Sequence, residues 1–161
     1  MGYQQGKLNM VKKSVLDGKK VLLVDDEPDV LDTLEDLLSE CEVVKCTHFK
    51  AAKDYMETRP FDMAILDIMG VEGYELLDIA VGRNITAVML TAHALSPENV
   101  VRSYKEGAAA YLPKEEMINI ASVLEDILKA KEQGKNPWTC LLYTADAADD
   151  DTIVGWWGGG V

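Results

Sequence analysis

The sequence predicts one α/β domain: a doubly wound, five-stranded parallel sheet with helices on both faces. Five short apolar segments recur at near-constant spacing, at residues 20–24, 43–46, 63–66, 85–90 and 109–112. Between them lie helix-length stretches in which apolar residues recur at three- and four-residue intervals. This alternation is typical of parallel sheets covered on both faces. Right-handed crossovers then wind the sheet in both directions from its centre.

The hydrophobicity of the five segments indicates their places in the sheet. The runs "VLLV" at 21–24, "MAIL" at 63–66 and "TAVML" at 86–90 are the most apolar, as strands buried on both faces are. The runs "VVKC" at 43–46 and "AAYL" at 109–112 are weaker, which is typical of edge strands. We therefore expect the first, third and fourth strands in the centre and the other two at the edges.

Three helices can be placed from their ends and apolar stripes. The first has Pro28 in its first turn, where proline is tolerated. Its stripe consists of Val30, Leu31, Leu34, Leu37 and Leu38. The helix before the last strand begins at Ser96-Pro97 and ends at Gly107. The last helix spans residues 115–130 and buries Met117, Ile120, Ala121, Leu124, Ile127 and Leu128.

Two apolar residues of the last helix, Ile118 and Val123, lie beside its buried stripe. One interpretation is that both are ordinary surface residues, because single exposed apolar side chains are common. The other is that they belong to a contact face for another molecule. The sequence leaves both interpretations open.

Composition excludes several classes of protein. The 161 residues are 48% hydrophobic and 27% charged, as in globular domains. No apolar run is long enough to span a membrane, and the N-terminus lacks the apolar core of a secretory signal. The net charge is −12, and no predicted helix carries a basic stripe, which argues against direct binding of nucleic acid or anionic membranes.

The cysteines and histidines point to a reducing compartment and away from a zinc site. Cys41, Cys46 and Cys140 are odd in number and widely spaced, which is typical of reduced thiols. His48 and His93 lie far apart, and a zinc site needs more ligands at closer spacing. We therefore expect a cytoplasmic protein.

Polar residues follow four of the predicted strands. Asp25 and Asp26 end the first strand, Asp67 the third, Thr91 the fourth, and Lys114 follows the fifth. Ligands of open parallel sheets bind outside the carboxyl ends of the strands. Crowded carboxylates suit a hard divalent cation such as Mg²⁺. Any one acid could instead be a solvated loop residue or a helix cap, but all of them falling on strand ends favours a site.

Four segments make the sequence resemble a known family. They are "VLLVDDEPDV" at 21–30, "MAILDIM" at 63–69, "VMLTAHA" at 88–94 and "AAYLPK" at 109–114. In this order and at these intervals they resemble the receiver domain of two-component response regulators. The resemblance covers residues 19–131, which we expect to form the receiver domain. It implies a flavodoxin-like fold with the strand order 2-1-3-4-5.

The resemblance also implies a role for each residue. Asp67 is expected to be the phosphoacceptor, Lys114 to pair with the phosphoryl oxygens, and Thr91 to be the switch hydroxyl. Tyr111 matches the switch aromatic, which moves inward after phosphorylation, and the backbone of Ala92 contacts the phosphoryl group. Such a protein is mainly a signalling switch that catalyses its own phosphorylation and dephosphorylation.

Magnesium is the cofactor that the resemblance implies. Its ligands are expected to be the carboxylates of Asp25, Asp26 and Asp67 and the backbone carbonyl of Met69. The implied phosphodonor is a sensor histidine kinase or a phosphotransfer protein. The aspartyl phosphate would then change the surface offered to an unidentified downstream protein. Neither nucleic acid nor a membrane is an expected direct partner.

Two other functions fit part of the pattern. A Mg²⁺-dependent phosphohydrolase with an aspartyl-phosphate intermediate uses a similar sheet. Its chemistry usually needs Asp-x-Asp, whereas here Asp25-x-Glu27 leads into Pro28. A degenerate receiver that only binds proteins has no need of an intact acid pair, acceptor, hydroxyl and lysine.

The two ends of the chain differ from the predicted domain. Residues 1–18 form an N-terminal extension, and residues 132–161 form a tail that we expect to be disordered. From about residue 139 the tail, beginning "TCLLYTADAADDD", resembles the translation of a transposase-end sequencing adapter. We therefore expect the natural chain to depart from this sequence near Trp138-Thr139. The alternative is a genuine acidic linker.

Overall fold

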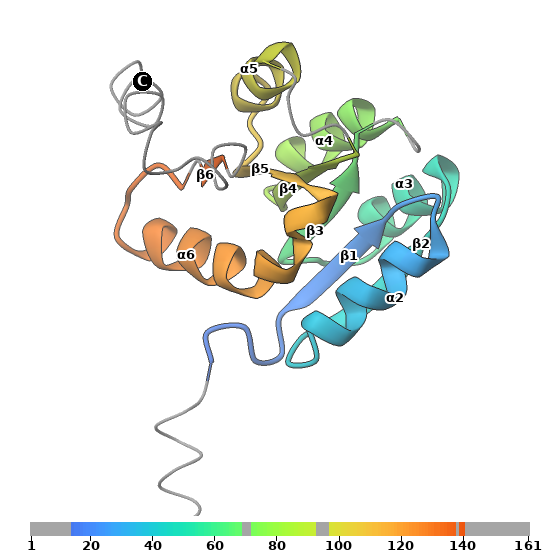
Figure 1. Cartoon of the computed structure of the whole chain (residues 1–161), viewed down its shortest axis with the longest axis horizontal. Coiled ribbons are helices and arrows are strands. Elements are labelled where there is room, and N and C mark those ends of the chain that lie inside the picture. Colours follow the sequence, from blue (N-terminus) through green and yellow to red (C-terminus); the bar gives the residue numbers. More distant parts are fainter. Residues whose placement is uncertain (1–13, 69–71, 93–96, 138, 141–161) are drawn as a thin grey trace, which may run out of the picture.

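Strands and helices alternate along the chain in the predicted manner (Figure 1). The computed structural model describes residues 14–68, 72–92, 97–137 and 139–140. The strands are β1 (Lys20–Val24), β2 (Glu42–Cys46), β3 (Met63–Asp67), β4 (Thr86–Thr91), β5 (Ala110–Pro113) and β6 (Thr139–Cys140). The helices are α2 (Pro28–Leu37), α3 (Phe49–Thr58), α4 (Gly73–Gly82), α5 (Pro97–Lys105), the 3₁₀ helix η1 (Lys114–Asn119) and α6 (Ile120–Glu132).

The strands form one parallel sheet in the order β2-β1-β3-β4-β5-β6. The predicted order of the first five strands, 2-1-3-4-5, is confirmed, with the apolar β1, β3 and β4 in the centre. The two-residue β6 pairs with Ala110 and Tyr111 of β5 and was not predicted. Two residues are too few to show the periodicity of a strand. Along these two residues, β5 is therefore not the free edge of the sheet.

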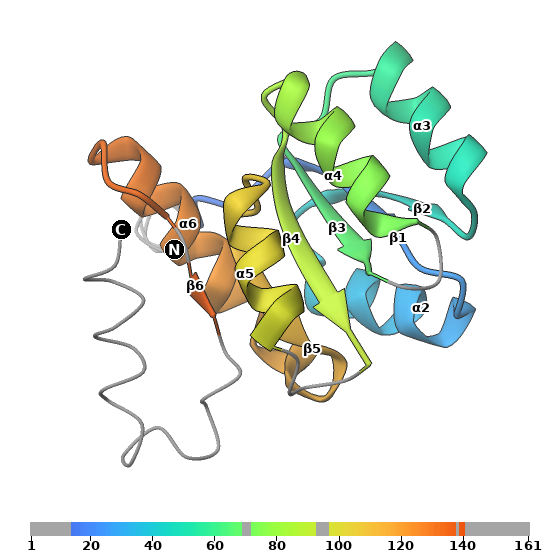
Figure 2. The ribbon, with the colours of Figure 1, turned by 90° about the horizontal axis from the view of Figure 1, so that it is seen from above.

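Each central strand sends alternate side chains into two apolar cores, one on each face of the sheet. In β3, Ala64 and Leu66 belong to the core that α3, α4 and α5 complete. Met63 and Ile65 belong to the core that α2 and α6 complete. Figure 2 shows α3 and α4 on one side of the sheet and α2 on the other. Burial on both faces explains why the strand is continuously apolar rather than alternating.

The last helix differs from the prediction at its start. The 3₁₀ helix η1 occupies Lys114–Asn119, so the α-helical stripe begins at Ile120 rather than near residue 117. Val123 is only 4% exposed and lies in the core. Its placement beside the stripe was wrong, because positions three and four apart from Ile120 and Ile127 share the buried face. Ile118, in η1, is 73% exposed.

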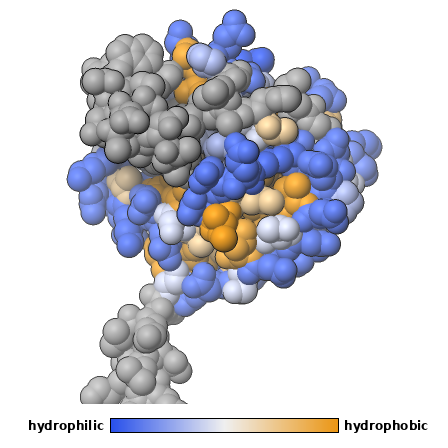
Figure 3. All heavy atoms as spheres, viewed as in Figure 1, coloured by the Kyte–Doolittle hydropathy of each residue, from blue (hydrophilic) through white to orange (hydrophobic). Residues whose placement is uncertain are grey.

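The surface in Figure 3 is largely hydrophilic, with an apolar area in its centre. Among the described residues, the exposed large hydrophobic side chains are Val81 and Ile118. They belong to different elements, α4 and η1. Isolated exposed apolar residues are ordinary at a protein surface, so these two positions do not by themselves define a contact face.

Candidate functional site

Strand register brings the acids of β1 and β3 together. Val24 pairs with Leu66 in the parallel ladder, so Asp25 and Asp67 occupy the next position on neighbouring strands. The arrowheads of the strands in Figure 2 end toward the same edge of the sheet. Both side chains are buried, with 0% of Asp25 and 4% of Asp67 exposed. Two carboxylates thus sit side by side at the carboxyl edge.

The same edge also receives the hydroxyl and the lysine. Thr91 is the last residue of β4 and is 1% exposed. It pairs with Pro113 of β5, and Lys114 follows directly. The predicted residues at the ends of four strands therefore come together, although they are scattered through the sequence.

Lys114 links the acids that follow β1 and end β3. Its Nζ lies 2.9 Å from Asp25 Oδ2, 2.8 Å from Glu27 Oε1 and 3.6 Å from Asp67 Oδ1. The lysine side chain is only 14% exposed, so solvent ions screen these contacts weakly. Asp25 Oδ1 accepts the backbone N–H of Glu27 at 2.9 Å, which fixes the carboxylate in place. One cation thus faces three carboxylates.

Burial and ion pairing act in opposite directions on the pKa values of Asp25 and Lys114. Desolvation raises the pKa of Asp25, and the N–H of Glu27 and the ammonium of Lys114 only partly offset it. Desolvation lowers the pKa of Lys114, but its hydrogen bonds to Glu27 and Asp25 outweigh burial and hold that pKa above its usual range. The cluster therefore favours the charged form of Lys114, whereas burial disfavours the charged form of Asp25. An excess of negative charge remains, which a further cation would stabilise.

A set of oxygen ligands for that cation lies at the start of α2. Asp25, Asp26 and Glu27 each offer a carboxylate oxygen, and these atoms lie within 4.8 Å of one another. Hard oxygen ligands around a carboxylate pair suit Mg²⁺. The sequence assigned Asp25, Asp26, Asp67 and Met69, and not Glu27. Met69 lies outside the described residues. Glu27 could have been found from its position directly after the acid pair.

The predicted switch residues lie beside the acids. Ala92 directly follows the buried Thr91 and is exposed. Tyr111 pairs with Met89 in the ladder and is 0% exposed, within the core on the α4 and α5 side. The ring of Tyr111 is thus already buried. This structure does not show the outward position from which the expected inward movement would start.

Gly73 is a site residue that sequence reasoning missed. It begins α4, and its N–H donates to the carbonyl of Ile68 at 3.3 Å. A Cβ added at Gly73 would lie 2.2 Å from the backbone oxygen of Asp67 and 2.9 Å from its carbonyl carbon. Only glycine therefore lets the first turn of α4 rest on the backbone of the acceptor strand.

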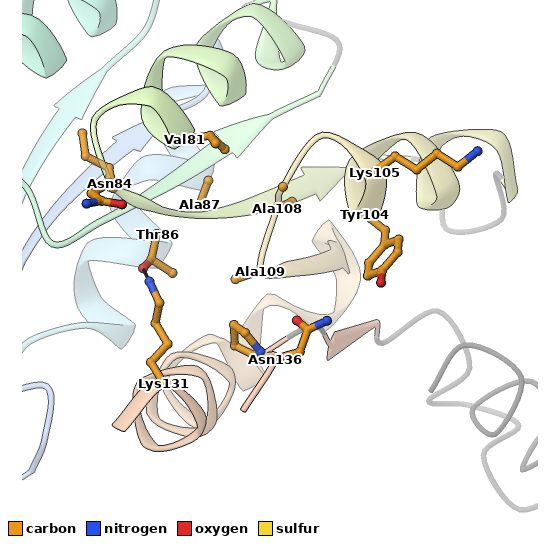
Figure 4. A pocket seen from close by; sticks show the side chains of 13 residues that line it. Val81, Asn84, Thr86, Ala87, Tyr104, Lys105, Ala108, Ala109, Lys131 and Asn136 are labelled. Atoms are coloured by element: carbon orange, nitrogen blue, oxygen red, sulfur yellow. Dashed lines mark hydrogen bonds between the residues drawn. The ribbon is translucent and has the colours of Figure 1, made fainter. Parts of the chain in front are cut away.

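A separate cavity of about 490 Å³ lies at the opposite end of the sheet (Figure 4). Thr86, at the start of β4, lines it together with Ala109 and Lys131. The Lys131 ammonium donates a hydrogen bond to the Thr86 hydroxyl. None of the site residues predicted from the sequence lines this cavity, so it is distinct from the acidic edge.

Comparison with known proteins identifies the family. Residues 21–127, more than half of the chain, match the sequence model of the response regulator receiver domain. The chain therefore belongs to the family of response regulator receiver domains. A receiver domain protein (CheY-like) from Methanospirillum hungatei has 28% sequence identity and a TM-score of 0.61, over 73% of this chain and 96% of that chain. The receiver domain of the Francisella response regulator 1452 has 25% identity and a TM-score of 0.57, over 67% and 97%.

Curated relatives are two-component regulators of greater length. The response regulator ARR18 of Arabidopsis thaliana is 33% identical over 103 residues, which are 60% of this chain and 16% of that protein. The regulatory protein VanRB of Enterococcus faecalis is 30% identical over 99 residues, which are 59% of this chain and 45% of that protein. The matched part is the receiver domain, and the phosphohydrolase alternative is not favoured.

Family membership carries general properties. Receiver domains bind Mg²⁺ at an acidic cluster, the type of cluster formed here by Asp25, Asp26 and Glu27. They interact with histidine kinases or phosphotransfer proteins. No helix in the described part of this chain has the length and apolarity needed to cross a bilayer.

Proposed function

We propose that Asp67 is the phosphoacceptor of this receiver domain, and that a phosphohistidine of a histidine kinase or phosphotransfer protein is the donor. A carboxylate oxygen of Asp67 attacks the phosphorus atom and forms a P–O bond. The P–N bond to the imidazole breaks, and the nitrogen keeps the electron pair. The observation that supports this role most is the nearly buried Asp67 carboxylate, 3.6 Å from the Lys114 ammonium at the carboxyl edge of the sheet.

The transferred group is stabilised mainly by charge and position. Lys114 places its ammonium between the acids of β1 and β3, where it can neutralise the phosphoryl oxygens. Bound Mg²⁺ supplies further positive charge to those oxygens. Asp25 and Asp26 would hold the ion, with Glu27, Asp67 or the carbonyl of Met69 completing the ligands.

The new phosphate then becomes a signal. The Thr91 hydroxyl can donate a hydrogen bond to a phosphate on the neighbouring strand, and the backbone of Ala92 is proposed as a second contact. Tyr111 would respond from its buried position. A small displacement of Thr91 and Ala92 alters the surface that a downstream protein recognises.

Labelling by a small phosphodonor tests the assignment. With Mg²⁺ and acetyl phosphate, the wild type should gain one phosphate that hydroxylamine removes, because acyl phosphates react with it. Asp67→Asn keeps the shape of the side chain but lacks the anionic nucleophile, so it should gain none while remaining folded. Intact-protein mass spectrometry and circular dichroism measure both properties. Equal labelling of the wild type and Asp67→Asn would overturn the proposal.

Metal binding is expected to stabilise the fold. Mg²⁺ at about ten times its Kd should add about 1.4 kcal/mol to the free energy of unfolding. Asp26→Ala removes one proposed ligand and should show a much smaller increase. Asp29→Ala removes an exposed carboxylate in the first turn of α2 and is the matched control. Thermal unfolding with and without Mg²⁺ decides this, and equal shifts in all three proteins would exclude Asp26 as a ligand.

The cellular setting is also part of the proposal. Cys41 and Cys46 are free, and burial raises the pKa of both thiols to about 11, which fits unreactive cysteines in a reducing cytoplasm. The net charge of −12 supports a domain that contacts neither nucleic acid nor membranes directly. Residues 19–131 are proposed as the receiver domain, with an extension before it and a tail after it.

A further inference from the structure

The cavity at the amino end of β4 has the size of a small-molecule site. Its volume of about 490 Å³ lies within the range of roughly 300–1,000 Å³ that such sites occupy. Its walls come from the end of α4, the start of β4, the turn between α5 and β5, and the end of α6. We call this cavity, lined by Thr86, Ala109 and Lys131, the Thr86 cavity.

Apolar side chains form part of the wall of the Thr86 cavity. Small ones leave the space open, namely Ala87, Ala108 and Ala109. Val81, at the end of α4, is 43% exposed and also lines the cavity. After α6 the chain turns at Gly134, where φ is +72°, and Pro137 reaches the same cavity. The cavity therefore offers a ligand an apolar surface, and it gives the exposed Val81 a partner when it is filled.

The charge along the Thr86 cavity is opposite in sign to that of the whole chain. The chain has 28 acidic residues and a net charge of −12. Among the described residues, none that lines the cavity is acidic, whereas Lys105 and Lys131 are basic. Figure 4 shows the Lys105 side chain extending away from the other labelled side chains and the Lys131 ammonium directed at Thr86. One cation thus faces the cavity, which favours an anion as the ligand.

Lys131 and Thr86 both have hydrogen bonds left to donate. An ammonium donates three and accepts none, so Lys131 is the donor to the Thr86 hydroxyl. That hydroxyl keeps its own proton for another acceptor, although Thr86 is only 7% exposed. In the described part of the chain neither side chain makes a second hydrogen bond, and Lys131 is in no ion pair. The oxygens of an anion would accept from both groups and balance the ammonium charge.

We propose that the Thr86 cavity binds a small organic monocarboxylate. Its two oxygens accept hydrogen bonds from Lys131 and Thr86, and its carbon skeleton covers the apolar wall that includes Val81. One ammonium matches one negative charge, whereas an anion of higher charge would be repelled by a protein of net charge −12. The site is separate from the acidic edge, so this proposal does not depend on the phosphoacceptor role of Asp67.

Titration of the isotope-labelled full chain with benzoate, at constant ionic strength, tests the proposal. Benzoate is a monocarboxylate with a compact apolar body. It should shift the backbone amide resonances of residues 84–87 and 107–109, which line the cavity, until the site is saturated. Benzamide has the same shape without the charge and should bind roughly ten-fold more weakly, the factor for one charged hydrogen bond. Inorganic phosphate should also bind more weakly than benzoate.

Three variants locate the binding groups. Lys131→Gln removes the ammonium and should weaken benzoate binding roughly ten-fold, and Thr86→Val, which keeps the shape but lacks the hydroxyl, roughly five-fold. Lys129→Gln is the matched control, because Lys129 is an exposed lysine of the same helix that does not line the cavity. It makes the same change in net charge and should leave the affinity unchanged. Circular dichroism checks that each variant is folded.

Several outcomes would overturn the proposal. The absence of saturable shifts at the cavity residues would exclude a ligand site there. Equal binding of benzamide and benzoate, or unchanged affinity in Lys131→Gln, would exclude recognition of the carboxylate by Lys131. An equal loss in Lys129→Gln would reduce the effect to net charge, and tighter binding of phosphate would exclude the monocarboxylate class.

Discussion

Lys114→Ala should slow phosphorylation of Asp67 by acetyl phosphate roughly 100-fold, the effect of removing one charged stabiliser from a water-poor site. Within the part of the chain that the structure describes, the Lys114 ammonium contacts Asp25, Glu27 and Asp67 together. Without it, the described charged side chains that remain in this cluster, Asp25, Glu27 and Asp67, are all acidic and oppose the approach of the phosphoryl oxygens. Mg²⁺ should still bind, because its carboxylate ligands remain. The initial rate of labelling, measured by intact-protein mass spectrometry, checks this result.

Lys45→Ala is the control for the Lys114 variant. Lys45 also pairs with two acids, Asp32 at 3.0 Å and Glu35 at 2.8 Å, but on the surface near α2 and β2. Exposed ion pairs of this kind contribute little to stability. Labelling of Lys45→Ala should match the wild type. A Lys114 variant labelled as fast as Lys45→Ala would show that the lysine has no part in phosphoryl transfer.

Gly73→Ala should destabilise the fold by about 1–3 kcal/mol, as overpacking of a tight contact does. The new methyl group would lie 2.2 Å from the Asp67 oxygen and 2.9 Å from Ile68 Cα. Both neighbours are backbone atoms, so no side-chain rotation relieves the contact. The start of α4 and the acceptor segment must separate, and labelling of Asp67 should slow as a result. Urea unfolding and labelling kinetics measure the two effects.

Gly82→Ala provides a control with the opposite sign. Gly82 ends the same helix, and an added Cβ there meets nothing within 4 Å. Alanine should therefore stabilise the protein by about 0.5–1 kcal/mol through the lower conformational entropy of the unfolded chain. If both alanine variants gained stability, the close approach of α4 to Asp67 would be disproved.

The fold could be predicted where the sequence pattern was strong and local. The continuous apolar runs of β1, β3 and β4 marked central strands, and Pro28 marked the first residue of α2. The start of the last helix was wrong because a 3₁₀ turn, η1, precedes the α-helix, as such turns often do at helix termini. Val123 was misplaced because its spacing of three and four residues from Ile120 and Ile127 puts it on the buried face. The two residues of β6 offered no periodicity to read.

The sequence predicted those site residues whose positions follow from the carboxyl ends of the strands. Asp25, Asp67, Thr91 and Lys114 meet because parallel strands place their carboxyl ends at one edge. Glu27 and Lys114 are 87 residues apart in the sequence, so a local sequence pattern could not predict that their side chains pair. Gly73 was missed for a similar reason. Its role depends on how closely α4 approaches the backbone of Asp67, which follows from packing.

Chemical mapping of the acyl phosphate tests the central claim most directly. Borohydride reduces an aspartyl phosphate to homoserine, so the phosphorylated position becomes a permanent mass change in one peptide. After treatment of the wild type with Mg²⁺, acetyl phosphate and borohydride, peptide mass spectrometry should find homoserine at Asp67 and at no other acid. Omitting the phosphodonor should leave Asp67 unchanged. Homoserine at Asp25, Asp26 or Asp62 instead, or a borohydride-resistant phosphate on serine or threonine, would contradict Asp67 as the phosphoacceptor.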